Sequence, residues 1–145
     1  MRRWGTEGVI SKDHVLKPDE TVLVLTRIYV NPLALIQDFQ GFKKLIAANL
    51  GVATTVKSFG PLAVDTGVTW DLFGETLSVW NDISKLKKFA YGTGTPHIKA
   101  MKEGKAMKCP VGFYHKVAKA SQISAIKEKL DKGNFLVARQ LYLEI

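Results

Sequence analysis

The sequence predicts an α+β fold in which an antiparallel sheet is built in the order β-α-β-β-α-β, followed by one more helix and strand. Three observations support this prediction. Residues 20–30 form a β-branched run that is apolar on both faces, as is typical of a strand covered on both sides. Asn31 and Pro32 supply the cap and the first residue of a helix over residues 31–50. The turn pattern at residues 65–67 then predicts a hairpin.

The remaining elements are predicted from local patterns along the chain. Gly51 is expected to end the first helix, and a strand is expected over residues 53–64. The second strand of the hairpin covers residues 68–81, with a bulge at Gly74. This order is that of the split βαβ, ferredoxin-like fold, which places its helices on one face of the sheet. After the hairpin, helices are expected over residues 83–91 and 96–108, followed by a strand over residues 111–120. The chain then ends with a helix over residues 121–133, capped by Ser121, and a strand over residues 135–145.

A chain of 145 residues, of which 46% are hydrophobic, fits a single domain with a sizeable core. Residues 1–19 show no periodicity and are interpreted as an N-terminal arm, so the domain is expected over residues 20–145. No run approaches the roughly 18 apolar residues that cross a membrane, and the N-terminus lacks the apolar region of a signal peptide. Cys109 is the sole cysteine, which excludes an internal disulfide and a cysteine-rich zinc site. We therefore expect a cytoplasmic protein.

The strand over residues 20–30 has a consequence for assembly. It is apolar on both faces, yet the predicted helices cover only one face of the sheet. A second copy of the chain packed on the other face would cover it, and two-fold dimers are the commonest oligomers. The sequence therefore predicts a homodimer formed through the sheet.

Positive charge is concentrated in one segment of the chain. The net charge is +8, and residues 85–119 contain nine lysines against a single acid, Glu103. Such asymmetry is typical either of a solvated helix face or of a protein with an anionic partner. Because residues 111–120 do not match the aromatic pattern of RNA-binding sheets, we expect only weak, non-specific binding of nucleic acid.

The segment "LSVWNDISKLKKFAY" (residues 77–91), followed by His97 and "IKAM", resembles a recurring pattern of the dimeric α/β-barrel superfamily. In that pattern a strand ends in a tryptophan, here Trp80, and a helix with leucine and phenylalanine precedes a histidine that opens further helix. The resemblance is closest to an uncharacterised family related to antibiotic-biosynthesis-type and spheroidene monooxygenase-like proteins. Some superfamily members oxidise electron-rich aromatics without a cofactor, and others bind haem. The resemblance therefore implies a dimeric α/β barrel with monooxygenase-like activity on a small apolar or aromatic molecule, with or without haem.

His97 is the candidate catalytic residue. If Thr95 caps the helix over residues 96–108, His97 is its second residue, and Met101 and Gly104 follow on the same face. An imidazole with an ordinary pKa of about 6.5 can act as a general base, and the resemblance also implies a role as a haem ligand. The alternatives are a structural histidine that hydrogen-bonds a loop carbonyl and a histidine at the dimer interface.

A second candidate set consists of aromatic residues from the hairpin and the helix after it. Aromatic walls with few polar groups are typical of small-molecule pockets, and the barrel implied by the resemblance would place some of these residues around a cavity. The same residues would also form an ordinary core, which their composition favours. No two histidines have the spacing of a metal site, so no metal bound by protein side chains alone is expected. The candidates are Trp70, Phe73, Trp80, Phe89 and Tyr91.

Two functions therefore stand side by side. The first is a monooxygenase-like enzyme in which His97 acts as a ligand or base. The second is a non-catalytic dimer that binds a small ligand or has a structural role. His115 in the strand over residues 111–120 faces either the pocket or the dimer interface, and the sequence leaves that choice open.

Overall fold

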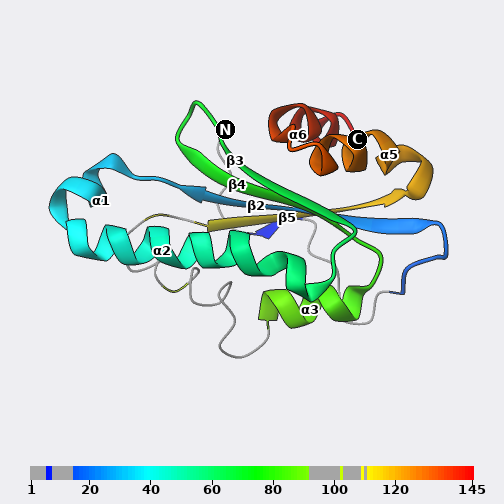
Figure 1. Ribbon diagram of the computed structural model, residues 1–145, viewed down its shortest axis with the longest axis horizontal. Helices are drawn as coiled ribbons and strands as arrows, with labels where there is room; N and C mark the ends of the chain where they lie inside the picture. The colour runs from blue at the N-terminus through cyan, green and yellow to red at the C-terminus, as the bar shows by residue number, and fades with distance from the viewer. Residues whose placement is uncertain (1–5, 8–14, 92–101, 103–108, 110) are drawn as a thin grey trace.

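The computed structural model describes residues 6–7, 15–91, 102, 109 and 111–145. Within these residues, a five-stranded sheet lies between helices on both of its faces (Figure 1). The strands are β1 (Thr6–Glu7), β2 (Glu20–Tyr29), β3 (Ala63–Val68), β4 (Phe73–Trp80) and β5 (Val111–Lys119). The helices are α1 (Pro32–Gln37), α2 (Phe39–Thr55), the 3₁₀ helix η1 (Val56–Phe59), α3 (Ile83–Tyr91), α5 (Ala120–Asp131) and α6 (Phe135–Leu143).

The sheet has the strand order β1-β5-β2-β4-β3, with β2 at its centre. β2 pairs antiparallel with β4 and β5, β3 pairs antiparallel with β4, and the two-residue β1 runs parallel to β5. Five consecutive residues of β2, Thr21 to Leu25, are buried, which confirms the prediction of a strand covered on both sides. The fold is α+β, and its four-stranded antiparallel sheet is compatible with a ferredoxin-like fold.

Each face of the sheet has its own apolar core. On one face, α5 and α6 pack against a row of strand residues that includes Leu23 and Leu77. On the other face, η1 and α3 pack around Trp80, and α1 contributes Ala34 against Ile28. Figure 1 shows this division, with α1, α2 and α3 on one side of the sheet and α5 and α6 on the other. The sheet is therefore the middle layer of three.

Residues 135–143 form helix α6, so the predicted C-terminal strand is wrong. The β-branched and aromatic composition favoured a strand, but Phe135, Ala138 and Tyr142 recur at helical spacing and are buried. As a helix, α6 packs with α5 on the sheet face that was expected to lack a cover. The prediction of helices on one face only is therefore also wrong. Because the chain covers both faces itself, the sheet does not need a second copy, and the reason for a dimer through that face is removed.

The first helical region extends further than predicted. α2 runs through Gly51 to Thr55, and the hydroxyl groups of Thr54 and Thr55 both donate to the Gly51 carbonyl (3.2 and 2.6 Å). The helix therefore continues for four residues beyond Gly51, and the prediction that Gly51 ends it is wrong. The strand predicted over residues 53–64 is helical up to Phe59, and Gly60, with a φ of 89°, ends the helical region.

The β3–β4 hairpin turns at residues 69–72 instead of 65–67, which lie inside β3. The glycine at position 67 serves helix packing, because a Cβ there would lie 2.3 Å from Cδ1 of Phe135 in α6. The pairing of β4 with β2 and β3 is continuous through Gly74, so the predicted bulge is absent.

Several local predictions are confirmed. The Asn31 side chain accepts a hydrogen bond from the Leu33 amide (3.1 Å), and Pro32 is the first residue of α1. α3 has the predicted bounds. α5 is also present, but its N-cap is Lys119, so the predicted cap at Ser121 is wrong. Apart from residue 102, the helix predicted over 96–108 lies outside the described residues. Among the helices that the structure describes, none has the length and apolar character to cross a membrane.

Candidate functional site

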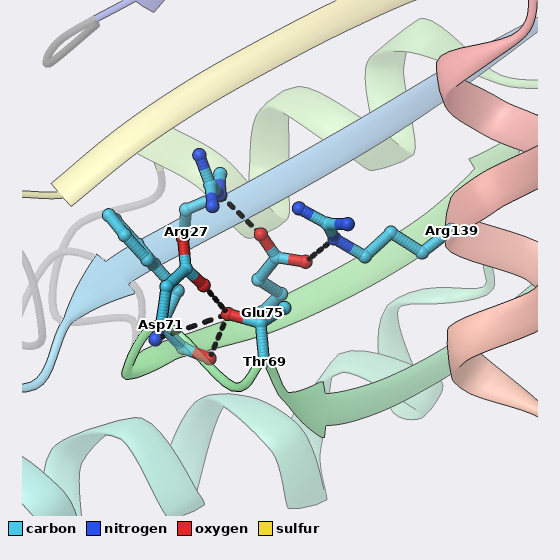
Figure 2. A network of polar contacts seen from close by, with 6 residues as sticks. Arg27, Thr69, Asp71, Glu75 and Arg139 are labelled. Carbon is cyan, nitrogen blue, oxygen red and sulfur yellow. Dashed lines mark hydrogen bonds and ion pairs between the residues drawn. The ribbon is translucent and has the colours of Figure 1, made fainter. Parts of the chain in front are cut away.

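A buried carboxylate lies on the sheet face that α5 and α6 cover. Glu75 is in β4, and its side chain has no exposed surface. Its Oε2 accepts a hydrogen bond from Nε of Arg27, and its Oε1 accepts one from Nε of Arg139 (Figure 2). The side chains of these arginines keep 18% and 23% of their surface exposed. One buried carboxylate thus joins two partly buried guanidinium groups.

Three elements bring these side chains together. Arg27 on β2 is the direct cross-strand partner of Glu75 on β4, so their Cβ atoms are close neighbours on one face. Arg139 comes from α6, where it is four residues after Phe135 and shares the face that packs on the sheet. The network therefore exists only because residues 135–143 are helical and lie over β4.

The ion pairs have an energetic role in the fold. A carboxylate removed from water is costly unless charged or polar partners satisfy it, and here both oxygens of Glu75 are satisfied. The pairs link α6 to the centre of the sheet, next to the apolar contacts made by Phe135 and Ala138. They therefore fix the position of α6 as well as the orientation of the two guanidinium groups.

The contacts with Glu75 use only part of each guanidinium group. A guanidinium has five N–H donors, of which one is on Nε and four are on the two terminal nitrogens. Within the described part of the chain, neither Arg27 nor Arg139 forms another hydrogen bond or ion pair. The guanidinium of Arg27 also lies 3.9 Å from the centre of the Phe73 ring, which supports it from one side. The bonds to Glu75 therefore hold both guanidinium groups in place through Nε. They leave the terminal nitrogens of both arginines available as donors.

The β3–β4 turn lies beside this network (Figure 2) and is itself tightly bonded. The Thr69 amide donates to the Phe73 carbonyl (2.8 Å), and the Thr69 hydroxyl donates to Asp71. Leu72 has a φ of 67°, a conformation that bulky side chains rarely adopt. The turn thus has a fixed conformation and holds Phe73 against Arg27.

The structure separates the aromatic residues that were predicted to surround one pocket. Trp80 and Phe89 stack with ring centroids 5.9 Å apart, in the packed core beneath α3. Phe73 points to the opposite face of the sheet, where it meets Arg27. Trp70, at the β3–β4 turn, is 95% exposed. Of these four rings, the structure therefore brings together only Trp80 and Phe89.

The remaining predicted site residues are Tyr91 and three residues that follow it in the sequence. Tyr91 is the last residue of α3, and only its backbone is described. His97, Met101 and Gly104 lie outside the described residues, so their roles stay predictions.

His115 is the histidine that the structure describes. It pairs with Val24 and therefore faces the α1–α3 side of the sheet. Burial lowers the pKa of this histidine below its usual value. Its Nδ1 atom is buried and has no hydrogen-bond partner among the described residues. Cys109 is buried, and no group of three or more potential metal ligands occurs in the described ranges.

Sequence reasoning did not single out the ion-pair network, although a signal for two of its members is present. Arg27 and Glu75 each stand at a position where the alternation of their strand favours an apolar residue. A charged residue at a core-facing position implies a charged partner. Arg139 carried no such signal, because residues 135–145 were predicted to form a strand.

Comparison with known proteins gives no family assignment. The chain matches no family model, no curated protein and no solved structure. The resemblance to dimeric α/β barrels therefore rests on the sequence pattern, and the antiparallel sheet is compatible with the coarser ferredoxin-like α+β fold.

Proposed function

We propose that the protein binds a small molecule through an anionic group, with the terminal nitrogens of Arg27 and Arg139 as donors. The observation that carries the proposal is that both guanidinium groups bind Glu75 through Nε alone. Glu75 holds the two side chains in place, while their terminal N–H groups are left for a ligand. The planar fork of an arginine matches the oxygens of a carboxylate or phosphate.

The surroundings of the two arginines favour an anion. Their partial burial reduces screening by water, and their remaining exposure of 18% and 23% leaves a path from solvent. The network of Arg27, Glu75 and Arg139 carries one net positive charge, which an anion would neutralise. Asp65 lies on the same sheet face, but it forms no ion pair with either arginine in the described structure.

The expected affinity for a simple anion is modest. A hydrogen bond to a charged group contributes about 1.5–3 kcal/mol, and part of that gain is offset by the entropy of binding. A net binding free energy of about 4 kcal/mol corresponds to a dissociation constant of about 1 mM. A natural ligand with further contacts would bind more tightly than phosphate or acetate alone.

Isothermal titration with phosphate and with acetate, at constant ionic strength, tests the proposal. The unmodified protein should bind one anion per chain. Arg139→Lys keeps a cation within reach of Glu75 but lacks the fork, so the affinity should fall about tenfold or more, equivalent to about 1.4 kcal/mol. Lys132→Gln removes an exposed cation on a different surface and should leave the affinity unchanged. The absence of saturable binding by the unmodified protein, or an equal affinity for Arg139→Lys, would contradict the proposal.

The monooxygenase-like function is a separate prediction. It depends on His97 and on the helix predicted over residues 96–108, which lie outside the described residues apart from residue 102. An anion site fits the alternative of a non-catalytic protein that binds a small ligand.

A further inference from the structure

Exposed apolar residues occur in α1, at the start of α2 and in the β3–β4 turn. Figure 1 shows where these elements lie in the fold. These side chains are between 44% and 95% exposed, with Trp70 the most exposed. We refer to this surface as the apolar end. Its members are Leu33, Ile36, Phe39, Val68, Trp70 and Leu72.

Backbone contacts join the two parts of the apolar end. The Val30 amide, two residues before α1, donates to the carbonyl of Leu72 in the turn (2.8 Å). Val68 pairs with Gly74, which pairs in turn with Ile28, so these three residues form one row on the same sheet face. Ile28 packs against α1. The apolar end is therefore continuous from α1 to the hairpin. Gly74 lies between the two parts and has no side chain that would separate them.

The hairpin holds the backbone that carries Trp70 in a fixed conformation. Thr69 bonds to both Asp71 and Phe73, and Leu72 is held at a positive φ that costs free energy. A turn ordered in advance loses little entropy when a partner binds it. Tryptophan is also among the residues that contribute most to protein–protein binding.

The size of the apolar end fits an interface between proteins. A large side chain has a surface of about 150–250 Å². Multiplied by their exposed fractions, the six residues of the apolar end expose on the order of 700 Å² in total. The largest apolar patch of a typical monomer covers about 300–600 Å². A stable interface buries about 800 Å² on each partner, so the apolar end matches the contribution of one partner.

The charges beside this surface indicate which partner it fits. Asp38 and Asp71 are balanced by Lys43 and Lys44, and Lys43 Nζ lies 5.5 Å from the centre of the Phe39 ring. An anionic membrane would require an excess of positive charge, which is absent among these residues. These four charges sum to zero, so two copies of the surface can meet without net repulsion, and two-fold dimers are the commonest oligomers. We propose that the apolar end is the contact surface of a homodimer, formed with a second copy of this chain.

This interface differs from the sheet-face dimer predicted from the sequence, and it does not depend on anion binding. Light scattering coupled to size exclusion should give about twice the chain mass of 16.1 kDa for the unmodified protein. The variant with both Ile36→Glu and Trp70→Glu should have half that mass, with unchanged circular dichroism, because both side chains are exposed. Leu136→Glu, at an exposed apolar position on α6, is the matched control and should stay dimeric.

Three outcomes would overturn the proposal. The first is a monomeric unmodified protein, and the second is a double variant that remains a dimer. The third is sedimentation of the unmodified protein, but not of the double variant, with phosphatidylcholine–phosphatidylglycerol vesicles, which would assign the apolar end to a membrane.

Discussion

Replacing Glu75 with glutamine should destabilise the protein, because a neutral side chain loses the ion pairs with both Arg27 and Arg139, the second of which holds α6. Glutamine has the same shape, but its amide offers one accepting oxygen and one donating nitrogen. It can accept from Arg27 or from Arg139, and the other guanidinium then faces a donor. Breaking a buried ion pair by removing one partner costs about 3–5 kcal/mol. Because the arginines are 18% and 23% exposed, water offsets part of this cost, and we expect a loss of about 3 kcal/mol in unfolding free energy.

For a chain of this size, that loss corresponds to a decrease in melting temperature of about 6–12 °C. Urea unfolding followed by tryptophan fluorescence would measure it, with an unchanged dependence on urea concentration. The control is Glu128→Gln, which removes an exposed carboxylate paired with Lys132 on the α5 surface and should leave the midpoint unchanged. In a double-mutant cycle, Arg139→Gln should cost less in the Glu75→Gln background than alone. An unfolding midpoint for Glu75→Gln equal to that of the unmodified protein would refute this reasoning.

Three further predictions concern other parts of the molecule. Gly67→Ala should destabilise the fold by about 1–3 kcal/mol in urea unfolding, because the added methyl group overlaps the Phe135 ring; an equal midpoint would show that α6 can move away. Burial lowers the pKa of His115 below the unfolded value of about 6.5, so the unfolded state binds more protons below that pH. The unfolding free energy should therefore decrease as the pH falls below about 6.5. His115→Gln should make this dependence on pH weaker. An unchanged dependence would contradict the assignment of this effect to His115. If the monooxygenase resemblance extends to haem, the purified protein incubated with haem should show a Soret band that His97→Ala abolishes, and a protein without that band does not bind haem through His97.

Much of the sheet could be predicted because its signals are local. β2 is a long apolar run, and α1 has both a capping asparagine and a proline at its first position. The C-terminal helix was missed because its composition resembles a strand, although Phe135, Ala138 and Tyr142 carry a helical repeat. That one error changed the assembly prediction, since α6 occupies the sheet face assigned to a second copy.

The ion-pair network could not be predicted in full because it is a tertiary arrangement. Arg27 and Glu75 are 48 residues apart in sequence and meet only through the pairing of β2 with β4. Arg139 reaches Glu75 across a separation of 64 residues and only if α6 is a helix packed on β4. The charged residues at core-facing strand positions were the available signal, and their mutual contacts required the fold.

The proposed anion site requires that the terminal nitrogens of two arginines fixed by Glu75 bind an anion. Nuclear magnetic resonance of the arginine side chains tests it most directly, since the chain has only four arginines and Arg27→Lys and Arg139→Lys would assign two of them. During a phosphate titration of protein labelled with nitrogen-15 arginine, the Nη signals of Arg27 and Arg139 should shift and saturate together, while their Nε signals, which report the bonds to Glu75, stay in place. Nη signals that do not move, or that move no more than those of the two N-terminal arginines, would contradict the account.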